Sequence, residues 1–297
     1  MELDIVRAIQ SLATDFWDVI MLIFSFFGEV GFFVVVFVLL FWCYDKRFAF
    51  KFAAVFGAVS VLSWGLKEIF MRPRPYTEAG VINYTNTSGY SMPSGHSAAI
   101  AVIAGTLAYE AQKARAKWFR IFGVIILVLL CLCVGLSRIY LGQHYLSDVL
   151  VGWALGFAVS LVMFKFVKFD NKEHIYALFL LPFLVFAYLM FADTLATSNF
   201  RAGEYAVIFM MAIGIILGYF FEKRFVNYTP AKVWWFELIK IFGFGGACIV
   251  LWFLCIWFLP NLVFYRSISA LFCMLIAMVL CPYIFKKIEK KFLRKTA

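Results

Sequence analysis

The chain has 297 residues, of which 65% are hydrophobic, 20% aromatic and only 15% charged, and its mean hydropathy is +0.92. Soluble domains are about half apolar and a quarter charged, so this composition excludes a soluble globular protein and indicates an integral membrane protein. The net charge of +10 does not indicate a nucleic-acid partner, because Lys and Arg are ordinarily enriched in the cytoplasmic loops of membrane proteins.

The first 44 residues predict one short helix and one interrupted membrane span. Residues 1–13 carry apolar side chains at helical spacing, which predicts a short amphipathic helix at the membrane interface. The apolar run 16–28 is too short to cross a bilayer alone, since a span needs about 20 residues. We therefore expect a half-helix that breaks at Gly28 and continues as residues 30–44.

The rest of the chain is a succession of apolar runs joined by short polar segments. The expected spans are 52–71, 97–112, 121–136, 149–166, 175–192, 205–221, 237–259 and 267–285. The fold class expected is all-α, a polytopic transmembrane helix bundle with a six-span core and additional C-terminal spans. We place the core in residues 1–166 and the additional helices in residues 167–297. The seven cysteines lie in or beside apolar runs, where they are expected to be free.

The distribution of positive charge predicts the orientation of these spans. Placing the 45–51 loop in the cytoplasm puts most of the 27 Lys and Arg residues in cytoplasmic loops and in the basic tail, 286–297. This arrangement satisfies the positive-inside rule and makes the C-terminus cytoplasmic. It also puts three polar clusters, within residues 67–75, 93–96 and 137–148, on the opposite face, which is external or lumenal.

These clusters hold side chains suited to binding and cleaving a phosphate ester. Ionisable residues are costly in a bilayer and usually mark a functional site. The candidates for binding phosphate are Lys67, Arg74 and Arg138, because a guanidinium or ammonium group neutralises phosphate oxygens. Arg72, in the doubled Arg-Pro sequence, is a secondary candidate.

The second cluster, Pro93-Ser94-Gly95-His96, directly precedes an apolar run. Ser94 is a natural N-cap for a helix that starts there. The backbone N–H groups of Gly95 and His96 would then be free to bind an anion. This segment therefore predicts a further part of the phosphate site.

The third cluster supplies a nucleophile. His144 and Asp148 are four residues apart and share one face if the segment is helical. A carboxylate that holds one imidazole nitrogen leaves the other free to attack phosphorus. His96 would protonate the leaving oxygen and then activate water. No cofactor or metal is expected, because the chain has no carboxylate cluster that would hold one.

The segments Lys67-x6-Arg74-Pro75, Pro93-Ser94-Gly95-His96 and Ser137-Arg138-x5-His144-x3-Asp148 resemble the three signature motifs of the type 2 phosphatidic acid phosphatase family. The family includes lipid phosphate phosphatases and glucose-6-phosphatase, and it is related to vanadium haloperoxidases. The resemblance covers roughly residues 50–166. It implies metal-independent phosphatase activity, with His144 as nucleophile, His96 as acid and Asp148 as the orienting carboxylate. It also implies that phosphate is bound by Lys67, Arg74, Ser94, Gly95 and Arg138.

The function expected is hydrolysis of a lipid phosphate or diphosphate at the external or lumenal membrane face. One alternative is a phosphotransferase that passes the phosphoryl group to another lipid. Another is a phosphatase of a soluble ester such as a sugar phosphate, and a third is a non-enzymatic lipid-binding protein or transporter. The expected partners are the phosphorylated lipid substrate and membrane lipids, without nucleic acid; the sequence leaves the substrate and the oligomeric state open.

Overall fold

The computed structural model describes residues 1–85, 87, 89–113, 116–165, 184–185, 202–230, 233–258 and 263–293. Every regular element in these residues is a helix, which confirms the all-α prediction. Six of the described helices are long and apolar enough to cross a membrane, or seven when a bent pair is counted as one span. The chain is thus an integral membrane protein.

The contacts divide the chain into two units. Unit 1 comprises Met1–Val35 and Val55–Asn171, and unit 2 comprises Val36–Ala54 and Lys172–Ala297. Unit 2 thus includes 36–54, which the sequence had assigned to the N-terminal core. The division at residues 166 and 167 stays a prediction.

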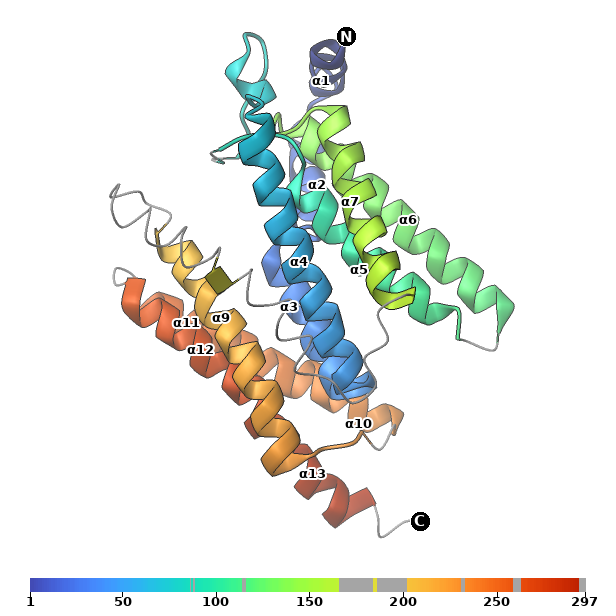
Figure 1. Ribbon diagram of the computed structural model, residues 1–297, viewed down its shortest axis with the longest axis vertical. Helices are drawn as coiled ribbons and strands as arrows, with labels where there is room; N and C mark the ends of the chain where they lie inside the picture. The colour runs from blue at the N-terminus through green and yellow to red at the C-terminus, as the bar shows by residue number, and fades with distance from the viewer. Residues whose placement is uncertain are drawn as a thin grey trace. The chain divides into compact units, whose positions relative to one another are not determined.

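Unit 1 contains the three polar clusters. Its helices, in chain order, are α1 (Glu2–Gln10), α2 (Asp15–Phe26), the start of α3 (Val30–Leu39), most of α4 (Lys46–Phe70), α5 (Gly95–Ala111), α6 (Lys117–Tyr140) and α7 (Leu146–Lys165). Helices α5, α6 and α7 lie side by side (Figure 1). The buried residues of α5 run almost without interruption from Ser97 to Thr106, so α5 is the central helix of the unit.

The two helical segments of the predicted interrupted span are present, as a bent pair that together is long and apolar enough to cross a membrane. Helix α2 starts directly after its N-cap Thr14. The Thr14 side chain accepts a hydrogen bond from the Trp17 N–H at 3.4 Å. Helix α3 follows after a short break, and the two segments are bent by 52°. The break contains Gly28, as expected. A Cβ atom on Gly28 would lie 2.7 Å from Cβ of His96, so a glycine is required for this approach to α5.

Helix α1 differs from its prediction in what its apolar face contacts. The helix forms, but Val6 is fully buried against Ile139, Tyr145 and Val149 of the protein itself. The apolar stripe that predicted an interfacial helix is therefore used for packing onto α6 and α7. A helical stripe in a sequence does not distinguish lipid from a protein surface as its partner.

Small residues bring α5 and α7 close together. A Cβ atom on Gly152 would lie 2.6 Å from the Ser94 carbonyl oxygen, and one on Gly156 would lie 2.5 Å from the Ala98 oxygen. Such contacts let helix backbones approach one another in membranes, where small side chains line the interfaces. The close packing fixes Ser94 relative to the start of α7.

Unit 2 contains the described C-terminal helices. They are α9 (Ala202–Phe221), α10 (Trp234–Leu238), α11 (Gly246–Phe258), α12 (Val263–Leu275) and α13 (Cys281–Ile288), and α9 packs along α12 (Figure 1). The expected spans 205–221, 237–259 and 267–285 fall on these helices and on the π-helical turns between them. The expected span 175–192 lies outside the described residues, apart from 184–185.

A buried polar network connects several π-helical turns within unit 2. Lys240 is fully buried; its ammonium lies 2.6 Å from a Glu237 oxygen and donates to the Trp42 carbonyl and the Tyr228 hydroxyl. The Tyr228 hydroxyl in turn donates to Glu289 at 2.5 Å. Buried charges are tolerated when they are paired in this way. The network therefore holds its helices together from within.

The α5–α7 packing predicts unequal effects of two glycine substitutions. Gly156→Ala should destabilise the protein by about 1–3 kcal/mol, because the added methyl group overpacks a tight interface. Gly123→Ala in α6 is the matched control, since its Cβ meets nothing within 4 Å. The measurement is thermal unfolding of the two variants in detergent. Equal melting temperatures for both would contradict the packing described here.

Candidate active site

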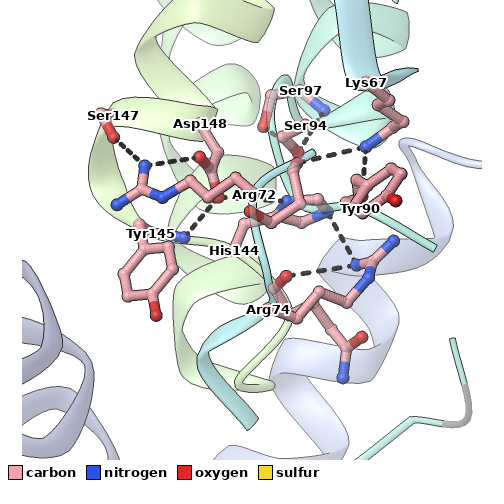
Figure 2. Close-up of polar contacts among 12 residues, drawn as sticks. Lys67, Arg72, Arg74, Tyr90, Ser94, Ser97, His144, Tyr145, Ser147 and Asp148 are labelled. Atoms are coloured by element: carbon pink, nitrogen blue, oxygen red, sulfur yellow. Dashed lines mark hydrogen bonds and ion pairs between the residues drawn. The ribbon is translucent and has the colours of Figure 1, made fainter. Parts of the chain in front are cut away.

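The three polar clusters meet at one place in unit 1. They come from the end of α4, the start of α5, the end of α6 and the start of α7, and Figure 2 shows residues of all three clusters around His144. The cations Arg74 and Arg138 are 7% and 2% exposed. His144 and Asp148 are 2% and 0% exposed. These four side chains thus form a buried group of charged residues.

The first cluster is shaped by its prolines. Helix α4 ends at Phe70, because proline lacks the N–H that would continue the helix at 73 and 75. Lys67, in the last turn, donates to the carbonyl oxygens of Tyr90 and Ser91 at 2.9 and 3.1 Å. It thereby holds the segment that leads into Ser94.

Arg74 is the second arginine of the doubled Arg-Pro sequence. It donates to the carbonyl oxygens of Gly89 and Gln143, and its Nη1 atom lies 3.3 Å from Nε2 of His144. Nε2 is the nitrogen expected to attack phosphorus, and Arg74 is a cation expected to bind the phosphate oxygens. The two expected roles therefore meet at this contact (Figure 2).

The second cluster forms the helix start that the sequence predicted. Helix α5 begins at Gly95, and the Ser94 hydroxyl accepts from the Ser97 N–H and hydroxyl at 3.4 and 2.9 Å. The Ser94 N–H donates to the Asp148 carbonyl at 2.9 Å, which ties the cap to α7. Gly95 is exposed, with nothing within 4 Å of a Cβ placed on it. The backbone of this first turn is thus open to an anion.

The third cluster is held by a turn at the end of α6. The Arg138 carbonyl accepts from the N–H groups of Gln143 and His144 at 3.1 and 3.2 Å. Gly142 closes the turn at φ +73°, and a Cβ there would lie 2.4 Å from the Ile82 carbonyl oxygen. Only glycine combines this backbone angle with so close an approach. The Arg138 side chain donates to Ser25 of α2 at 2.5 Å.

His144 and Asp148 come together without the helix that the sequence analysis required. Helix α7 starts at Leu146, so His144 precedes it, in the turn. Nδ1 of His144 lies 3.6 Å from Oδ2 of Asp148, and that oxygen also accepts from the Tyr145 N–H at 2.9 Å. At 3.6 Å the pair is an electrostatic contact rather than a hydrogen bond. Catalytic hydrogen bonds are often long in the absence of substrate.

His96 is next to the same charges. Its backbone and Cβ pack against Gly28 at the bend between α2 and α3. Arg138, His144, Arg74 and Lys67 are all near enough to act on it electrostatically. The structure thus brings together all eight predicted site residues: Lys67, Arg74, Ser94, Gly95, His96, Arg138, His144 and Asp148.

Arg72, the secondary phosphate candidate, has different partners. Its Nη1 atom donates to Asp148 at 2.8 Å and to the Ser147 hydroxyl at 2.6 Å, and its Nη2 atom donates to Glu2 at 2.5 Å. Both carboxylates compete with any phosphate for this guanidinium. Arg72 is therefore better placed to hold Asp148 than to bind an anion (Figure 2).

Sequence reasoning missed two residues that contact the site. Ser25 is a buried polar residue within an apolar half-helix, and that isolation could have marked it. Glu2 lies in the first turn of α1, 70 residues before Arg72, and no local pattern connects the two. In the described part of the chain no group of three His, Cys, Asp or Glu residues is arranged to bind a metal ion.

Fold and site together define an integral membrane protein with a cluster of cations and histidines, most of them buried, where several helices of a bundle begin or end. Residues 48–172 match the model of the PAP2 superfamily. The match confirms the resemblance that the three motifs indicated.

The chain is similar to the phosphatidylglycerophosphatase B of Bacillus subtilis, with 38% identity over 125 residues, 40% of this chain and 56% of that protein. It is 27% identical over 206 residues to rat sphingosine-1-phosphate phosphatase 1, covering 66% of this chain and 47% of that protein. The chain therefore spans about half the length of these relatives. A crystal structure of a PAP2-type phosphatidylglycerolphosphate phosphatase from Bacillus subtilis matches 56% of this chain and 86% of that one, with 26% identity and a TM-score of 0.49.

The site predicts that His144 stays neutral under acidic conditions. Burial, and then the charges of Arg74, Lys67 and Arg138, hold the pKa of His144 well below its usual 6.5. The unfolded chain therefore binds the extra proton first, and this group makes the folded state less stable as the pH falls below about 6.5. The measurement is a carbon-13 NMR titration of the imidazoles, which is tractable with three histidines in the chain. A His144 resonance that titrates at or above 6.5 would contradict this electrostatic environment.

Proposed function

We propose that the protein is a membrane phosphatase that hydrolyses a lipid phosphate or diphosphate monoester through a phosphohistidine on His144, without a metal ion. The observation that supports this most directly is the orientation of His144. Its Nδ1 atom faces the Asp148 carboxylate at 3.6 Å, while its Nε2 atom faces Arg74 at 3.3 Å. A nucleophilic imidazole needs this division between an orienting anion and a phosphate-binding cation.

In the proposed first step, Nε2 of His144 attacks phosphorus and the bond to the ester oxygen breaks. Lys67, Arg74 and Arg138 stabilise the charge on the phosphoryl oxygens, and the N–H groups at the start of α5 add fixed dipoles. The negative charge of the bound phosphate offsets the surrounding cations and favours the protonated form of His96, which donates its proton to the departing alcohol oxygen. Asp148 stabilises the positive charge that the modified imidazole then carries.

In the second step, His96, now neutral, accepts a proton from water while the water oxygen attacks the phosphohistidine. The nitrogen–phosphorus bond breaks, phosphate leaves, and both histidines return to their starting states. The cations supply the charge stabilisation that a metal ion provides in other phosphatases. Charge stabilisation by these cations is the physical basis for the proposed metal independence.

The relatives support a lipid substrate. The two named above are called phosphatases of phosphatidylglycerophosphate and of sphingosine 1-phosphate, each of which carries phosphate on a lipid. The similarity to the second extends over 206 residues, beyond the 125 residues matched by the superfamily model. We propose that the site opens at the external or lumenal face, because the positive-inside rule puts the opposite loops and the C-terminus in the cytoplasm.

The experiment is phosphate release by purified protein in detergent across a panel of phosphatidic acid, sphingosine 1-phosphate, phosphatidylglycerophosphate, undecaprenyl diphosphate and glucose 6-phosphate. We expect release from a lipid and unchanged rates in the presence of a chelator. Release from glucose 6-phosphate alone would favour a soluble ester. Transfer to added lipid acceptors in place of release would favour a phosphotransferase. Activity that is lost in chelator and restored by magnesium would contradict the metal-free mechanism.

His144→Ala is expected to reduce turnover at least about 10⁴-fold, because it removes the attacking atom. His174→Ala is the matched control, since His174 is the one histidine of the chain outside the motifs. The measurement is the initial rate of phosphate release, with thermal unfolding to establish that both variants are folded. Substantial turnover by folded His144→Ala protein would eliminate this residue as the nucleophile.

A further inference from the structure

The Arg72 guanidinium lies between two carboxylates, one from the first helix of unit 1 and one from its helix α7. On one side it contacts Asp148 at 2.8 Å, and on the other it contacts Glu2 of α1 at 2.5 Å. Its Cζ atom lies over the Tyr145 ring, 3.9 Å from the ring centre, and makes a cation–π contact. Together with the Ser147 hydroxyl, these contacts fix the Arg72 side chain directly beside the orienting carboxylate. Figure 2 shows Arg72 between Asp148, Ser147 and Tyr145.

Glu2 is itself firmly held. One carboxylate oxygen accepts from Arg72, and the other accepts from the Ser147 N–H at 3.0 Å, next to Asp148 in the chain. Burial opposes ionisation of Glu2, but the hydrogen bonds from Arg72 and Ser147 outweigh it and lower its pKa. Glu2 is therefore an anion at neutral pH.

The helix that carries Glu2 is anchored along its whole length. Gln10 donates to the carbonyl oxygens of Ile82 and Tyr140 at 2.8 Å and accepts from the Ile82 N–H at 2.9 Å. Arg7 donates to the Ala79 oxygen at 2.6 Å, and Val6 is fully buried against α6 and α7. The position of Glu2 is therefore set by the fold and not by the Arg72 contact alone.

The charges in this cluster have a consequence for His144. Arg72 paired with Asp148 alone would be neutral overall, and Asp148 would do little for a cationic imidazole. With Glu2 included, two anions surround one cation, and the group carries one net negative charge with Asp148 as its member at Nδ1 of His144. Arg72 also occupies Oδ1 of Asp148, so that Oδ2 is the oxygen that faces the ring.

We propose that Glu2 and Arg72 are positioning residues for the proposed reaction, holding Asp148 in place and anionic so that it can support the nucleophile His144. The inference rests on the proposed function and deepens it. The N-terminal helix then belongs to the catalytic apparatus, although it contributes no atom that touches the phosphate.

A positioning role predicts a change in turnover rather than in substrate affinity. Glu2→Gln keeps the size and hydrogen-bonding capacity of the side chain and removes its charge. We expect kcat to fall about tenfold with an unchanged KM, because a less well held Asp148 weakens the attack geometry and leaves the phosphate-binding cations in place. Arg72→Lys retains the charge but loses the fork that contacts both carboxylates, and kcat should fall about a hundredfold.

The matched control is Asp4→Asn. Asp4 is also an acidic residue of α1, but it is 71% exposed and contacts the N-terminal amine and Arg7 instead of Arg72. Asp4→Asn should leave kcat and KM unchanged. Thermal unfolding of each variant separates a loss of fold from a loss of positioning.

The pH profile provides a readout that a purely structural role would not change. The charged groups that face His144 are Lys67, Arg74, Arg138 and Asp148, together with His96 when it is protonated. Glu2 is not in this set and acts on it through Arg72, which contacts Asp148. Removing the Glu2 charge leaves Arg72 opposed by Asp148 alone and makes the imidazolium less favourable. The acidic limb of kcat/KM should move to lower pH by about half a unit in Glu2→Gln.

The deciding experiment is a double-mutant cycle with Asp148→Asn. If Glu2 acts through Asp148, adding Glu2→Gln to Asp148→Asn should change kcat less than twofold. Full additivity of the two substitutions, or an Arg72 variant that raises KM with kcat unchanged, would overturn the proposal. A wild-type protein that releases no phosphate would instead contradict the proposed function, so the two failures are distinguishable.

Discussion

The site depends on holding three cations together in a mostly apolar protein. Lys67, Arg74 and Arg138 repel one another, and burial strengthens that repulsion because the surroundings screen charge poorly. Neutral oxygens hold them in place: Lys67 donates to two backbone carbonyls, Arg74 to two others, and Arg138 to the Ser25 hydroxyl. Carbonyls and hydroxyls fix the positions of cations without cancelling their charge. An arrangement of this kind favours a bound anion, and a phosphoryl group has the charge and the oxygen atoms to satisfy it.

The two arginines of the doubled Arg-Pro sequence have different partners although they are the same residue type. Arg72 and Arg74 are two residues apart, and the proline between them turns their side chains to different partners. Arg72 is paired with Glu2 and Asp148, whereas Arg74 faces Nε2 of His144. In the proposed mechanism, the first arginine supports the nucleophile through Asp148 and the second binds the substrate phosphate.

The local parts of the structure could be predicted from the sequence, because their causes are local. Ser94 caps α5 and the chain breaks at Gly28, as N-cap chemistry and span length indicated. The count of spans and of positive charges also placed the three clusters on one face of the membrane, where a single site would need them. The partner of Glu2 could not be predicted, since its contact with Arg72 depends on how α1 packs onto α6 and α7. The same packing gives the apolar face of α1 a protein surface where the sequence had suggested lipid.

The central claim is that His144 carries the phosphoryl group, and rapid-quench trapping tests it most directly. Enzyme mixed with a lipid phosphate labelled at phosphorus and quenched within milliseconds should carry label that is stable in alkali and lost in acid. The label should map to the peptide containing His144 and be absent from His144→Ala. Label on another residue, or rapid turnover with no labelled protein at any time, would contradict the account.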